Sequence, residues 1–183
     1  LCVVPAEKVE DLVDFIYRVT RLRLGAEALL VNAATLASLL GKDSAEIAQL
    51  SRSLPAWMAL VGICGQSILP EMRAAAHAAD IGEIAQQFGL RMVDSFPGIS
   101  GARILERLCE PSGKVFWKDC LKGTSASLFF TTTLDSAPGY VSTVQGLALA
   151  QGWNPGEIGV YVQPQNMGTS VQVEFIIPYD AAD

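Results

Sequence analysis

The chain has 183 residues, of which 50% are hydrophobic and 17% are charged, and its formal net charge is −6. This composition is typical of one folded domain with its own core and argues against a disordered chain. The longest apolar run, Ala56 to Cys64, falls far short of the roughly 18–20 residues that span a bilayer. Lysine and arginine do not cluster with aromatic residues, which argues against a nucleic-acid partner.

The first half of the chain alternates strand and helix signals. A short apolar strand at 1–4 precedes Pro5 to Leu24, where apolar residues at helical spacing predict a helix. Asn32 and Gly41 are suited to begin and end a following helix. The other elements expected here are a strand over 28–32, helices over 33–40 and 44–53, and a strand over 56–65 that is buried on both faces.

A long helix is predicted over Ser67 to Phe88, followed by a strand over 90–96. The only histidine, His77, falls on one face of this helix with Arg73 and Asp80, so we expect it to be solvated. The opposite, buried stripe is expected to consist of Ile68, Met72, Ala75, Ala76 and Ala79.

The pattern weakens over 97–124, where we expect a helix at 101–109 and a loop or lid at 116–119. A strand over 125–134 then places Ala126, Leu128 and Phe130 on one face, with Phe129 on the other. Pro138 lies in the first turn of the next helix. Its expected buried stripe consists of Tyr140, Val141, Val144, Leu147 and Ala148.

The last part of the chain, Ile158 to Asp180, predicts a β-hairpin. Both runs alternate with period two, and Gln-Asn-Met-Gly between them supplies turn residues. If Pro164 faces Thr169, Val162 pairs with Val171 and Val160 with Val173, so the valines share one dry face. The other face carries Tyr161, Gln163, Ser170, Gln172 and Glu174.

These elements predict a single domain over 1–183 of the α+β class. We expect a mostly antiparallel sheet with helices on one face, and a ferredoxin-like arrangement is the first choice. A strand–helix–strand–strand order closes the chain, and a similar order with extra helices opens it.

No self-contained catalytic motif is present in the sequence. It contains neither G-x-S-x-G nor a P-loop, and its four cysteines show no C-x-x-C spacing. We expect these cysteines to be buried and reduced in a cytoplasmic protein without a secretory signal. With one histidine and no cysteine pair, no metal site is expected.

The polar face of the hairpin is the best candidate for a ligand site. Tyr161, Gln163, Gln172 and Glu174 would project from adjacent strands within reach of one another. A phenol and two amides are suited to orienting an oxygen-rich or phenolic molecule, and Glu174 could orient a neighbour or act as a base. The alternative is that they form the solvated outer face of a half-exposed sheet. Apolar walls or core positions are expected for Trp117, Phe129, Phe130 and Trp153.

The hairpin sequence, IGVYVQPQNMGTSVQVEFIIPYD, resembles the C-terminal half of FAD-linked oxidases of the vanillyl-alcohol oxidase and p-cresol methylhydroxylase superfamily. The likeness extends from about Phe129 to the end of the chain. The resemblance implies that this chain is the cap domain that covers the substrate. Its partner would be an N-terminal domain of the same protein that holds FAD. We therefore expect this chain to be part of a longer flavoenzyme and to be inactive alone. Whether it forms a homo-oligomer is left open.

The resemblance implies oxidation of an alcohol, a hydroxyacid or an alkylphenol by the flavin. Some hydroxyacid-oxidising relatives hold a metal with histidines and a carboxylate in this half. The hairpin has no histidine, which argues against that mechanism. The alternative function is a non-catalytic small-molecule-binding or assembly domain on a ferredoxin-like sheet. The exposed surface distinguishes the two readings, since a cap needs an apolar docking surface.

Overall fold

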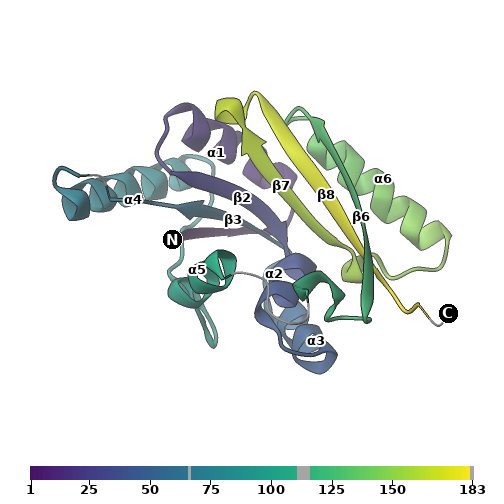
Figure 1. Cartoon of the computed structure of the whole chain (residues 1–183). Helices are drawn as coiled ribbons and strands as arrows, with labels where there is room; N and C mark the ends of the chain where they lie inside the picture. Colours follow the sequence, from purple (N-terminus) through teal and green to yellow (C-terminus); the bar gives the residue numbers. More distant parts are fainter. Residues whose placement is uncertain (66, 111–115, 182–183) are drawn as a thin grey trace.

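The computed structural model describes residues 1–65, 67–110 and 116–181, and its centre is a six-stranded sheet (Figure 1). The strand order is β1-β3-β2-β7-β8-β6, and every neighbouring pair is antiparallel. The predicted α+β class with a mostly antiparallel sheet is therefore confirmed. The strands are β1 (Cys2–Ala6), β2 (Glu27–Asn32), β3 (Trp57–Gly62), β6 (Thr124–Thr132), β7 (Gly159–Gln165) and β8 (Ser170–Tyr179).

Helices and short turns connect these strands. The α-helices are α1 (Glu10–Arg21), α2 (Ala33–Leu40), α3 (Ser44–Ser53), α4 (Pro70–Gln87), α5 (Gly101–Cys109) and α6 (Ala137–Ala150). Three 3-10 turns are η1 (Trp117–Asp119), η2 (Pro155–Glu157) and η3 (Asn166–Gly168), and β4 (Ser95–Phe96) pairs with β5 (Ile99–Ser100). Within the described ranges, no helix is long and apolar enough to cross a membrane.

The sheet is built from two units of the same strand topology: the second is strand–helix–strand–strand, and the first adds α2 and α3 between its last two strands. In the first, β3 lies between β1 and β2, and in the second, β8 lies between β6 and β7. The units meet where β2 pairs with β7, at Leu30–Val162 and Val31–Tyr161. Each unit is a split β-α-β arrangement, and a ferredoxin-like fold for the whole chain stays a prediction.

Helices cover both faces of the sheet, which corrects the prediction that they cover one face. On one face α1, α4 and α6 pack on a core that includes Phe15, Val162 and Phe175. On the other face α2, α3 and α5 pack on a second core that includes Leu36 and Ile104. Strand β3, the middle strand of the first unit, is buried on both sides, as predicted. A second layer of helices is therefore needed to keep it from water.

The β7–β8 hairpin has the predicted faces but a different register. Val162 pairs with Val173 rather than with Val171, and Gln165 with Ser170 closes the ladder. The turn at 166–168 is built from residues with positive φ, 47° at Asn166 and 58° at Met167, which moves the point of closure. Because the shift is two residues, the valines still face the core.

Helix α4 buries a different stripe from the predicted one. Its buried residues are Ile81, Ile84 and Ala85, whereas Met72 is 67% exposed. The first half of α4 projects beyond the sheet (Figure 1), so its apolar side chains find no core to cover. His77 lies one turn before Ile81 and is intermediate in exposure, neither fully solvated nor buried.

Three other predictions are corrected by the structure. The strand expected over 90–96 is limited to β4 and an isolated bridge between Val93 and Val3, because the chain turns back at Gly98 with φ 76°. On α6 the stripe is partly wrong, since Val141 and Ala148 are buried but Tyr140 and Leu147 are exposed. The four cysteines are free, but Cys64 and Cys109 are exposed and only Cys2 is buried.

Candidate functional site

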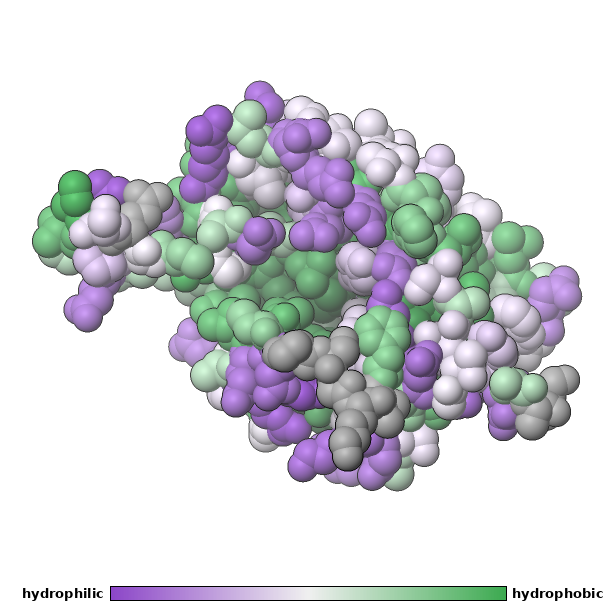
Figure 2. Space-filling view, viewed as in Figure 1, coloured by the Kyte–Doolittle hydropathy of each residue, from purple (hydrophilic) through white to green (hydrophobic). Residues whose placement is uncertain are grey.

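A pocket of about 570 Å³ lies on the sheet face that α2 and α5 cover. It opens as a hollow with apolar walls near the centre of the view in Figure 2. Its floor comes from β2 and β7, which belong to different units of the sheet, and η1 borders it. The apolar lining consists mainly of leucines: Leu1, Leu29, Leu36, Leu39, Leu60, Leu105 and Leu108.

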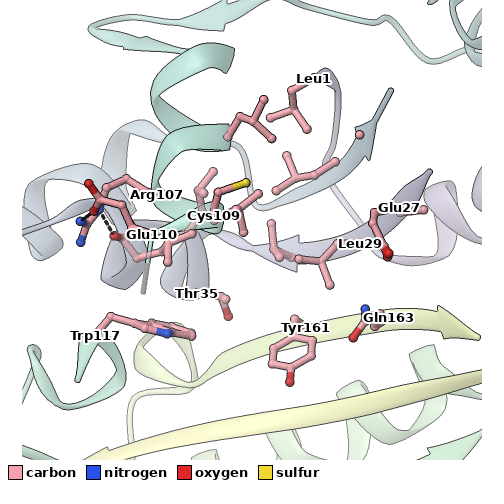
Figure 3. A pocket seen from close by; sticks show the side chains of 18 of the residues that line it. Leu1, Glu27, Leu29, Thr35, Arg107, Cys109, Glu110, Trp117, Tyr161 and Gln163 are labelled. Atoms are coloured by element: carbon pink, nitrogen blue, oxygen red, sulfur yellow. Dashed lines mark hydrogen bonds and ion pairs between the residues drawn. The ribbon is translucent and has the colours of Figure 1, made fainter. Parts of the chain in front are cut away.

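Two of the four predicted site residues line this pocket. Tyr161 and Gln163 both project into it from β7 (Figure 3), because residues two apart on a strand share a face. Directly across the ladder, Glu174 pairs with Tyr161 and Gln172 with Gln163. The structure thus brings all four candidates together on one sheet face. Glu174 does not line the pocket, and it is only 4% exposed.

The buried Glu174 carboxylate is the centre of a polar network. Tyr161 donates its hydroxyl hydrogen to Glu174 Oε2, and Lys118 Nζ from η1 pairs with Glu174 Oε1. Ser127 of β6 also donates a hydrogen bond to this carboxylate. Its two oxygens therefore have partners from three different elements, which fits the rule that buried charges are paired and hydrogen-bonded.

The network moves the proton affinities of its members. Burial alone would raise the pKa of Glu174, but hydrogen bonds from Lys118, Ser127 and Tyr161 outweigh it and lower the pKa. Burial and the neighbouring Glu174 carboxylate raise the pKa of Tyr161 far above its usual range. Glu174 is therefore ionised and Tyr161 protonated near neutral pH. A carboxylate with a lowered pKa is a poor general base, so the orienting role for Glu174 is the better supported alternative.

The orientation of the Tyr161 hydroxyl decides what the pocket can recognise. Its hydrogen is committed to Glu174, so its oxygen offers lone pairs to a donor from a ligand. Lys118 keeps two further N–H donors after pairing with Glu174. Gln163 adds an amide that both donates and accepts. A ligand hydroxyl, which also donates and accepts, matches this set of partners.

The cationic side chains that line the pocket are each paired with a carboxylate. Of the two described cations that line it, Lys118 pairs with Glu174 and Arg107 pairs with Glu110. Arg107 Nε also donates to the Leu39 carbonyl oxygen, at 3.2 Å. The positive charge of each cation is therefore already balanced by a carboxylate of the chain itself.

Of the four aromatic wall candidates, Trp117 alone lines the pocket, where Phe116 joins it. Phe129 and Trp153 are exposed elsewhere, and Phe130 stacks on Phe175 in the core with ring centroids 6.2 Å apart.

Sequence reasoning missed Lys118, which lay in the segment predicted as a loop or lid. Its ammonium lies 5.5 Å from the ring centroids of both Phe116 and Trp117. A lysine beside two aromatic residues was the available signal, since such a cation is stabilised by the ring faces. Arg107 was missed because its spacing on α5 resembles that of any solvated helix residue.

Among the described residues, no group of three or more His, Cys, Asp and Glu side chains could hold a metal ion. Among known proteins, no family model matches this chain, and no curated protein is significantly similar to it.

Proposed function

We propose that this chain is the substrate-binding cap of an FAD-dependent oxidoreductase, and that its pocket holds a small, uncharged, mainly apolar molecule with a hydroxyl group. The observation that carries the proposal is the Tyr161 hydroxyl, held by the buried Glu174 at the floor of a leucine-lined pocket. An alcohol or an alkylphenol fits this description better than a hydroxyacid does.

The preference for an uncharged ligand follows from the electrostatics. A carboxylate that enters an apolar pocket loses its hydration and needs a partner cation. Lys118 and Arg107 already have carboxylate partners, and Glu27 at the rim adds a further negative charge. A neutral hydroxyl needs only hydrogen bonds, which Tyr161 and Gln163 supply.

The link to flavin rests on the resemblance of the hairpin that carries Tyr161 and Glu174. In the intact enzyme the flavin would supply the hydride-accepting chemistry. The residues of this chain would exclude water with their leucine side chains and fix the ligand hydroxyl at Tyr161. The alternative of a non-catalytic binding domain uses the same pocket, and it differs in needing no flavin domain.

Calorimetric titration with 4-methylphenol and with 4-methylbenzoate tests the pocket. We expect the phenol to bind and the benzoate to bind at least tenfold more weakly, since a charge would be buried without a partner. Tyr161→Phe should weaken phenol binding about 2–10-fold, the effect of one hydrogen bond, whereas the exposed control Tyr179→Phe should not. Equal affinity for the two probes, or an unchanged affinity in Tyr161→Phe, would contradict the proposal.

Visible absorbance after incubation with FAD and desalting tests whether this chain binds the flavin itself or leaves it to another domain. We expect a colourless protein, because the flavin would be held by another domain. A retained flavin band would show that this chain holds the cofactor itself and would overturn its assignment as a cap.

A further inference from the structure

The outer edge of β6 is open and unprotected. The strand pairs with β8 through nine consecutive residue pairs without a bulge, and no described strand pairs with its other side. Its sequence, TSASLFFTT, contains neither a charged residue nor a proline. Charges, prolines and bulges are the usual devices that stop a sheet edge from pairing with another chain. Their absence marks this edge as a pairing surface.

The surface beside this edge is also uncharged. Between Thr124 and Ala150 the only charged residue is Asp135, in a chain where 17% of residues are charged. Phe129 is 65% exposed on β6, and Leu147 is 61% exposed on α6. On the right of the view in Figure 2, where β6 and α6 lie in Figure 1, apolar side chains alternate with pale ones of intermediate hydropathy. Phe130 packs on Tyr140 of α6, so its neighbour Phe129 points to the opposite face of the sheet. Exposed apolar side chains therefore flank the β6 edge on both faces, as is common at interfaces.

We propose that β6 pairs with β6 of a second copy of this chain, forming a symmetric dimer with one continuous sheet. The opposite edge cannot serve, since Val3 of β1 is fully buried and its carbonyl oxygen accepts a hydrogen bond from Val93 at 2.8 Å. Pairing of β6 with β1 of another copy, which would give an open filament, is thereby blocked. A two-fold axis at β6 closes the assembly at two chains.

The absence of charge on β6 fits pairing with itself. Near a two-fold axis each residue meets its own counterpart or a close neighbour, and like charges facing each other would destabilise the pair. Centred on Leu128, the pairing would place Phe129 close to its counterpart. The same operation brings α6 beside α6, and Gly139 and Gly146 on that helix have no atom within 4 Å of a Cβ position. The two helices therefore have room to approach.

The two units of this chain already join in this manner. They meet through antiparallel pairing of β2 with β7, which are corresponding strands of the two units. The proposed dimer would repeat that arrangement between β6 strands.

Light scattering coupled to size exclusion, at several protein concentrations, measures the assembly. We expect a mass of twice the 19.5 kDa of one chain. Phe129→Lys should raise the dimer dissociation constant at least about tenfold, because it places two like charges at the pairing edge. Met72→Lys changes an equally exposed apolar residue on the projecting α4 and should leave the dimer intact. Circular dichroism would verify that both variants are folded.

Hydrogen exchange gives a second readout that does not depend on a variant. In the dimer, outward-facing amides of β6 should exchange more slowly at high protein concentration than at low concentration. A monomer at every concentration, or a dimer lost in Met72→Lys and kept in Phe129→Lys, would overturn the proposal. So would β6 protection that appears only when a different protein is added.

Discussion

Tyr161 and Glu174 face each other directly across the β7–β8 ladder, and the tyrosine hydroxyl donates its hydrogen to the buried carboxylate. The pairing fixes the direction in which the hydroxyl oxygen is presented to the pocket. It also makes Glu174 part of the sheet structure, because Lys118 on η1 and Ser127 on β6 hydrogen-bond to the same carboxylate. Four elements are joined at one side chain, so the following predictions begin there.

Glu174→Gln should destabilise the fold by about 1–3 kcal/mol, because Lys118 loses its charge partner in a largely buried position. Urea unfolding followed by circular dichroism measures this change. The matched control is Glu110→Gln, which breaks an exposed pair with Arg107 and should change stability by less than about 1 kcal/mol. Equal losses in both variants would contradict a structural role for the network.

The double variant Lys118→Met/Glu174→Gln should lose less unfolding free energy than the sum of the losses in the two single variants. Each single change leaves one buried partner unpaired, whereas the double variant removes both charges. Unfolding free energies of the two single variants, the double variant and the wild type form the thermodynamic cycle. Simple additivity would show that the Lys118–Glu174 pair contributes no coupling.

The contribution of Glu174 to stability should depend on pH with a defined sign. Its pKa in the folded protein is below the ordinary value of 4.5, so the unfolded chain binds this proton more readily. The contribution is therefore complete above pH 4.5 and is lost as the pH falls through the lower folded-state pKa. The difference in unfolding free energy between wild type and Glu174→Gln should shrink over that acidic range. A difference independent of pH would argue against an ionised Glu174.

Asn32→Ala should be among the most destabilising single changes, at about 2–4 kcal/mol. The Asn32 amide donates to the Ile158 carbonyl oxygen at 2.8 Å, and its oxygen accepts from the Thr35 and Val160 amides at 3.0 and 2.9 Å. Removing the side chain leaves buried backbone groups without partners. The control is Asp43→Ala, an exposed helix cap whose loss costs about 1 kcal/mol, measured by the same urea unfolding.

Local signals in the sequence were sufficient for much of this fold. Asn32 accepts a hydrogen bond from the Thr35 amide, as its position before the helix over 33–40 predicted. The two faces of the β7–β8 hairpin followed from alternation with period two. Its register did not follow, because it depends on positive φ values at Asn166 and Met167, and a two-residue shift leaves every side chain on the same face.

Contacts between distant residues set the limit of sequence reasoning. Asn32 was predicted as a cap, but its bond to Ile158 joins residues 126 positions apart. Tyr161 and Glu174 were predicted because they share a hairpin, whereas Lys118 comes to Glu174 from a turn 56 residues earlier. The buried face of α4 was predicted wrongly for a related reason. Alanines occur all around this helix, so the sequence does not show which face packs against the sheet.

The junction of the two units lies along the pocket, since residues of both β2 and β7 line it. Only two residue pairs of the ladder connect β2 to β7, against five to nine in the other ladders of the sheet. Asn32 and Thr35 supplement this short seam with side-chain bonds to Ile158 and Val160. A ligand held between Leu29 and Tyr161 would act as a clamp across it. A bound ligand would then restrict the motion of the two units relative to each other, including parts of them that lie far from the pocket.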